Sequence, residues 1–171
     1  ESDTKAETKA FSTTLDLSSV GGDVLGEIHV AQWQHSYGAV VGNGGTTPNQ
    51  ASTKSISHGL MSLHLASPNG VSALHKAAWS GAVVASASLT VRELDKPGGS
   101  TVSSYRADLE NVVVSSISTG SDGPDCEPTV SLGLGYERIR WTYVAATKAG
   151  PVSSTSGWNA EQKKEKKKKK K

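Results

Sequence analysis

The side chains in this sequence that could do chemistry are five histidines, one cysteine and a short run of acids. Two histidine pairs are each six residues apart, namely His29 with His35 and His58 with His64. At about 3.3 Å per residue, such a spacing puts the two members of a pair roughly 20 Å apart on an extended strand. That is too far for one pair to share a metal ion. A cluster of histidines from different strands stays open, but ordinary half-exposed histidines are the favoured interpretation.

The other reactive groups lie in a turn-rich segment. Cys126 stands between Asp125 and Glu127, whose negative charges disfavour a reactive thiolate. As the single cysteine, it also excludes an intramolecular disulfide and a cysteine-based metal site. Asp122 adds a third acid that could help to ligate Ca²⁺, but a solvated turn is the favoured interpretation. We therefore expect no catalytic residue, no bound metal and no cofactor.

A long polar segment, Gly42 to Thr53, contains no large apolar side chain and predicts an exposed loop. Its glycines weakly resemble those of a phosphate-binding loop, but neither a Gly-Lys-Ser/Thr sequence nor a predicted helix follows them. Loops of this length in compact domains are usually functional or disordered. The candidate residues here are Gly42, Asn43, Gly44, Gly45, Thr46, Thr47, Pro48, Asn49 and Gln50.

The elements that must position these residues are mostly strands, because apolar and polar residues alternate along the chain. A phase slip at Glu137-Arg138 predicts a bulge within one of the strands. The expected strands are 11–17, 26–37, 55–65, 82–94, 103–119, 129–145 and a short edge strand at 156–159. The predicted fold class is mainly β: a two-sheet barrel or sandwich with one flanking helix.

That helix is predicted over about 67–80. Ser67 is a candidate N-cap, Pro68 suits the first helical position and Gly81 suits the position after the last turn. The apolar face is predicted from helical spacing and comprises Val71, Leu74, His75 and Ala78.

Length and composition indicate one domain with a thin core. Of 171 residues, only 33 are Leu, Ile, Val or Phe, so the domain is expected to need partners for stability. We predict a polar leader at 1–10, one β domain at 11–160 with an extended loop at 42–54, and a disordered lysine-rich tail at 161–171. No window is long and apolar enough to predict a transmembrane helix.

The charge is unevenly distributed. Residues 161–171 hold eight of the 18 basic residues and two of the 16 acids, which leaves 10 basic and 14 acidic residues in the rest of the chain. The body is therefore net acidic, and specific nucleic-acid binding is not expected. The run Lys166 to Lys171 could contact anionic lipid, nucleic acid or an acidic surface through its charge alone, but a solubility tail is the favoured interpretation. The single cysteine and the lack of a predicted transmembrane helix fit a bacterial cytosol, and they do not exclude later export.

Several ordered stretches resemble the haemolysin-coregulated protein (Hcp) family. The stretch 105–120 (YRADLENVVVSSISTG) is similar to the family's central strand, and 27–33 (EIHVAQW) to its early strand. The segments 136–143 (YERIRWTY), 150–152 (GPV) and 157–159 (GWN) resemble its closing part. The residues that match family motifs are Glu27, Trp33, Tyr105, Val112, Val114, Ser115, Ser116, Tyr136, Tyr143, Gly157 and Trp158.

This resemblance implies a non-enzymatic, structural protein. Members of the family are inner-tube subunits of type VI secretion systems: six copies form a ring, rings stack into a hollow tube, and a contractile sheath ejects it. The implied partners are other copies of the chain, sheath, spike and baseplate proteins, and effectors in the lumen. The implied location is the bacterial cytoplasm before firing and the exterior afterwards. The extended loop at 42–54 would contact a neighbouring subunit or ring.

Two other interpretations stay open. One is a tail-tube subunit of a phage or of an extracellular contractile injection particle, which shares the fold. The other is a monomeric β-sandwich binding module with tryptophans as its platform. The four tryptophans, at 33, 79, 141 and 158, fall on four elements, which argues against a single aromatic patch.

Overall fold

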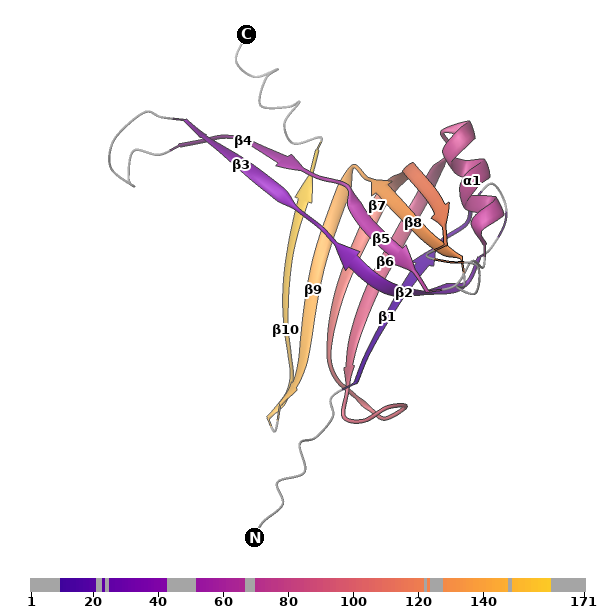
Figure 1. Cartoon of the computed structure of the whole chain (residues 1–171). Coiled ribbons are helices and arrows are strands. Elements are labelled where there is room, and N and C mark those ends of the chain that lie inside the picture. The colour runs from indigo at the N-terminus through magenta and orange to yellow at the C-terminus, as the bar shows by residue number, and fades with distance from the viewer. Residues whose placement is uncertain are drawn as a thin grey trace.

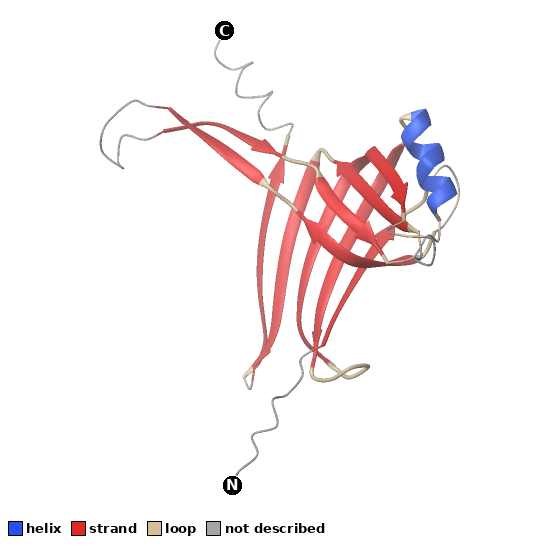
Figure 2. Cartoon of the chain, viewed as in Figure 1, coloured by secondary structure: helices blue, strands red, loops and turns tan. Residues whose placement is uncertain are grey.

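The computed structural model describes residues 10–20, 23, 25–42, 52–66, 70–121, 123, 128–147 and 149–160, without the side chains of 39–42 and 52–57. Strands dominate it, and one helix interrupts them (Figure 2). The elements are β1 (Ala10–Leu17), β2 (Glu27–Gln34), β3 (Tyr37–Gly42), β4 (Ser52–His58), β5 (Met61–Leu65), α1 (Val71–Ser80), β6 (Val83–Leu94), β7 (Thr101–Gly120), β8 (Thr129–Gly135), β9 (Arg138–Thr147) and β10 (Gly150–Asn159).

Six strands close into a barrel, as the mainly β prediction anticipated. Their order is β7-β6-β1-β2-β5-β8, and β8 returns to pair with β7, so the ring has no open edge. All of these pairings are antiparallel. Alternate residues point inward and fill the barrel, as Leu15, Leu89 and Leu109 do with no exposed surface. Closure thus gives a thin-cored chain one continuous apolar centre.

Strand β7 holds the architecture together because it has more neighbours than a strand in a simple sheet. Along one edge it pairs with β6, while the other edge pairs first with β9 and then with β8. The switch falls at Asn111, whose φ of 52° is left-handed, a conformation that Asn tolerates better than most residues. Leu109 and Val112 are both buried, so the inward face changes phase there.

Strands β9 and β10 extend the sheet beyond the barrel (Figure 1). β10 pairs with β9 along its whole length and has no second neighbour among the described strands. Most of its residues are exposed, and Val152 is 59% exposed. The short edge strand expected at 156–159 is therefore the end of a longer one.

The helix is shorter than the predicted 67–80. α1 begins after Gly70, whose φ of 75° makes it the N-cap in place of Ser67; Ser67 and Pro68 lie outside the described residues. Gly81 ends the helix in the left-handed conformation, as predicted. The buried face is Ala73, Leu74 and Ala77. The small alanine side chains let the helix pack closely on the barrel. Helical spacing alone did not identify Ala73 and Ala77 as part of the buried face.

Two predicted strands are each a pair of strands. The segment 55–65 breaks at Gly59-Leu60 into the end of β4 and β5, and 129–145 breaks at Tyr136-Glu137 into β8 and β9. The predicted bulge at Glu137-Arg138 is thus wrong, because the phase slip marks a turn between strands. In the part of the chain described, no helix is long and apolar enough to span a membrane.

Candidate functional site: the root of a projecting hairpin

A two-stranded hairpin stands away from the barrel (Figure 1). β3 and β4 pair only with each other among the described strands, from Tyr37 opposite His58 to Gly42 opposite Ser52. The loop expected at 42–54 is therefore shorter, since Gly42 ends β3 and 52–54 begin β4. Asn43 to Gln50 lie outside the described residues. An isolated two-stranded hairpin is marginally stable, so what holds its base matters.

The chain crosses between barrel and hairpin twice, and both crossings are fixed by hydrogen bonds. The first is His35-Ser36 and the second is Gly59-Leu60. The Gly59 N–H donates to the Ser36 carbonyl at 2.9 Å. A Cβ at Gly59 would lie 2.7 Å from Ser36 Oγ, so only glycine fits this close approach without a shift.

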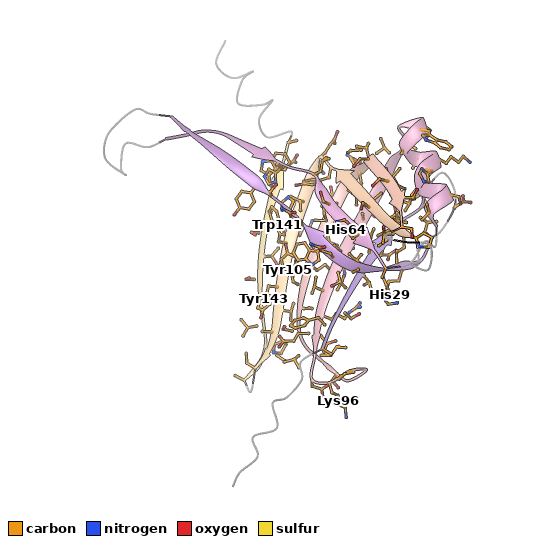
Figure 3. All side chains as sticks on the ribbon, viewed as in Figure 1. His29, His64, Lys96, Tyr105, Trp141 and Tyr143 are labelled. Atoms are coloured by element: carbon orange, nitrogen blue, oxygen red, sulfur yellow. The ribbon has the colours of Figure 1, made fainter. Side chains whose placement is uncertain are left out.

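Aromatic rings and histidines gather around these crossings. We call them the hairpin-root cluster: Trp33, His35, Tyr37, His58, Tyr105, Tyr136, Trp141 and Trp158. The His58 and Trp158 ring centroids are 3.9 Å apart, and Trp33 stacks on Tyr105 at 5.4 Å. Figure 3 shows Tyr105 and Trp141 near the point where the hairpin joins the barrel, far from His29 and Lys96.

The Tyr136 hydroxyl links the two crossings. It lies 2.6 Å from His35 Nε2 and 3.3 Å from His58 Nδ1. The hydroxyl also lies 3.4 Å from the Gly59 carbonyl oxygen, so its one proton can go to that oxygen or to a histidine, while its lone pairs accept from an imidazole N–H. Burial, with a smaller contribution from Tyr105, raises the pKa of Tyr136 to about 12. Burial also lowers the pKa of His35 from 6.5, so both groups favour their neutral forms.

An open pocket of about 450 Å³ lies beside the cluster. Its walls are mainly aromatic, from β3, β4, β7, β9 and β10: Tyr37, His58, Tyr105, Trp141, Ser156, Gly157 and Trp158. Gly157 suits the close pairing of β10 with β9 here, because a Cβ would lie 3.1 Å from the Ile139 carbonyl oxygen. Among the described side chains, no three His, Cys, Asp or Glu gather as a metal site would require. The pocket is therefore shaped to hold an apolar or aromatic group.

The motif residues divide between this cluster and the barrel. Trp33, Tyr105, Tyr136 and Trp158 belong to the cluster, and Gly157 lines its pocket. Val112 and Val114 are buried in the core, and Ser115 and Ser116 lie at a register shift in β7. Glu27 opens β2 and accepts a hydrogen bond from Thr14 at 3.0 Å. Tyr143 is 47% exposed on β9, where it pairs with Tyr105 at the rim of the cluster.

Sequence reasoning missed the meeting of His35 with His58, whose ring centroids are 5.9 Å apart. It also argued against one aromatic patch, which is wrong for three tryptophans: Trp33, Trp141 and Trp158 all belong to the cluster, and only Trp79 lies elsewhere. The sequence feature that could have predicted this meeting is the loop rich in Gly, Pro and Asn, because such a loop can be the turn of a hairpin. A hairpin centred on it puts Tyr37 opposite His58.

Comparisons with known proteins agree on one family. The sequence profile described as "Type VI secretion system effector, Hcp" matches residues 19–143. A solved structure described as a type six secretion system protein superposes with a TM-score of 0.68 at 17% identity, covering 90% of this chain and 98% of the other. Hcp1 from Salmonella typhimurium gives 0.63 at 16% identity, covering 90% and 97%.

Hcp1 from E. coli EAEC 042 gives a TM-score of 0.63 at 20% identity, covering 87% of this chain and 100% of the other. A search of curated proteins finds no match. At these identities the solved structures show the shared fold, and the profile match over most of the chain shows the family. The chain belongs to the Hcp family of type VI secretion tube proteins.

Proposed function

We propose that this chain is the structural subunit of a hollow tube, in which six copies close into a ring and the rings stack. The observation that carries the proposal is a closed barrel joined to an open sheet, β9 and β10, whose outer strand β10 is exposed along most of its length. A closed barrel needs no partner for its edges, whereas an open sheet edge offers hydrogen bonds to a neighbour. The extension is therefore the part suited to contact between copies.

The projecting hairpin supports stacking. Its strands have no barrel partner among the described strands, and a hairpin alone gains little stability in water. A contact from a neighbouring subunit or ring would stabilise it. We assign the residues at and beyond its tip, Gly42 to Gln50, to that contact. Repeating it six times per ring lets a weak individual contact hold a stack.

Membership of the family supports a wider role, which we include in the proposal. In this proposal a sheath ejects the tube, with spike and baseplate proteins at its ends, and effectors travel in the lumen. The chain is cytoplasmic before firing and extracellular after it. We propose no catalytic activity: the hydroxyl and imidazoles of the hairpin-root cluster join structural elements.

The test is negative-stain electron microscopy of the purified chain at moderate salt, with mass by light scattering on the same sample. Sixfold rings or hollow stacked tubes are expected. A monomer at every concentration would contradict the proposal and favour a solitary binding module, with the 450 Å³ aromatic pocket as its site. Neighbouring genes separate a secretion system from a phage tail or an extracellular injection particle, since a sheath-recycling ATPase indicates secretion.

A further inference from the structure

One tryptophan is far from the cluster and open to solvent. Trp79, in the last turn of α1, is 82% exposed and is the most exposed large apolar side chain in the described part of the protein. The His75 ring lies one helical turn before it, with centroids 5.7 Å apart. Val83, just after the helix, is 63% exposed. We call the Trp79 side chain the knob. Because the His75 ring beside it restricts its conformations, the knob loses little side-chain freedom on binding.

The hairpin-root pocket has room for an indole and a lining of matching chemistry. Its volume of about 450 Å³ lies within the roughly 300–1,000 Å³ of pockets that enclose small molecules, so an indole can enter. Tyr37, Trp141 and Trp158 offer ring faces and edges, and aromatic pairs gain attraction beyond the area that they bury. Buried tryptophans in pockets are also the commonest anchors of protein interfaces.

The knob and the pocket cannot meet within one chain. α1 packs at one side of the barrel, whereas β9 and β10 extend beyond the opposite side (Figure 1). Two different surfaces that fit each other on opposite sides of one molecule make a head-to-tail contact, which forms a ring if its rotation closes. We propose that Trp79 of one copy enters the hairpin-root pocket of the next copy.

This contact rests on the proposed ring and identifies a residue that each copy contributes to its neighbour. It places the neighbour's indole against Tyr37 and His58, where β3 and β4 leave the barrel. Formation of the contact would thus also fix the root of the hairpin. Assembly and hairpin orientation are then coupled through one side chain.

The test uses matched pairs of variants, with the concentration at which copies assemble measured by light scattering. Trp79→Ala removes the knob, and Lys76→Ala changes another exposed residue of the same helix. Ser156→Trp fills the pocket, and Ser153→Trp puts the same bulk on the other face of β10. We expect Trp79→Ala and Ser156→Trp each to raise the assembly concentration about 30-fold or more, as hot-spot losses do. The two controls should match the wild type.

Mixing the two disruptive variants gives a sharper result. Trp79→Ala keeps its pocket and Ser156→Trp keeps its Trp79, so one productive contact remains between them. The mixture should form two-chain species at concentrations at which each variant alone is monomeric. Absence of these species overturns the contact.

The failures of the two proposals differ. Rings that are unaffected by Trp79→Ala keep the ring and overturn the contact. Open-ended oligomers that Trp79→Ala abolishes support the contact and overturn the ring. A wild-type chain that stays monomeric at every concentration overturns both.

Discussion

Replacing Tyr136 by phenylalanine tests whether one hydroxyl ties the hairpin to the barrel. The substitution removes the oxygen that lies 2.6 Å from His35 Nε2 and 3.3 Å from His58 Nδ1. It keeps the ring, which meets Trp158 edge-on at 6.4 Å. Packing should therefore survive, and the loss isolates the hydrogen bonds.

The expected cost follows from those two distances. A protein hydrogen bond contributes about 0.5–1.5 kcal/mol net. The 2.6 Å contact is short and the 3.3 Å contact is long for a hydroxyl, so only the first should contribute fully. Water can reach this half-buried site and partly replace the lost partner. We expect Tyr136→Phe to lower the free energy of unfolding by about 1–2 kcal/mol, measured by urea denaturation.

The pH dependence provides a second readout. The pKa of Tyr136 rises from 10.0 in the unfolded chain to about 12 in the folded protein, because of burial and then Tyr105. A raised pKa means that stability is fully present below pH 10 and is lost as the pH climbs towards 12. The wild type should lose stability over that window. Tyr136→Phe should lose less, and the remaining loss should come from Tyr105, whose pKa burial also raises.

Tyr143→Phe is the matched control, because it removes a hydroxyl from a tyrosine that is 47% exposed and pairs with Tyr105 at the rim of the cluster, whereas the hydroxyl near His35 and His58 belongs to Tyr136. Its change should stay within about 0.5 kcal/mol. Hydrogen exchange should locate the effect of Tyr136→Phe in the β3 and β4 amides. Equal stability of Tyr136→Phe and wild type, with unchanged exchange in the hairpin, would refute the assigned role of the hydroxyl.

Three further predictions concern the loop, the tail and acid. Deleting Asn43 to Gln50 should leave the circular dichroism spectrum and the rings intact but shorten the stacks seen by electron microscopy; long normal tubes would contradict the loop assignment. Removing Lys166 to Lys171 should leave ring formation unchanged by light scattering, whereas loss of rings would make the tail an assembly element. Burial lowers the pKa of His35 from 6.5, so its contribution is complete above pH 6.5 and is lost as the pH falls through the folded-state pKa. Urea denaturation should show this acid loss in the wild type and a smaller one in His35→Gln.

The barrel could be predicted from the sequence because its strands follow a local rule. Inward and outward residues alternate in β8, where Val130, Leu132 and Leu134 are all buried as expected. The rule failed where the backbone changes phase or direction. Asn111 and the turn at Tyr136-Glu137 both interrupt alternation, and a phase slip alone does not distinguish a bulge from a strand end.

The hairpin-root cluster was harder to predict because its members come from six elements and the connections between them. Spacing along one strand correctly separates His29 from His35, but it is silent on His35 and His58, which meet only after β3 pairs with β4. Motif resemblance singled out Trp33, Tyr105, Tyr136 and Trp158 without showing that they lie together. Long-range pairing is what converts scattered aromatic residues into one site.

The position of β8 in the ring has a consequence for synthesis. β8 joins β5 to β7, and it is the last of the six barrel strands to leave the ribosome. Until Thr129–Gly135 emerges, the nascent chain has β5 and the second half of β7 as open edges. Unpaired edges invite pairing with other chains. When a cell makes many copies at once, each nascent chain can therefore pair wrongly with another through these edges. The risk ends when the seven residues of β8 are synthesised and close the barrel, and only then can the chain assemble correctly with other copies.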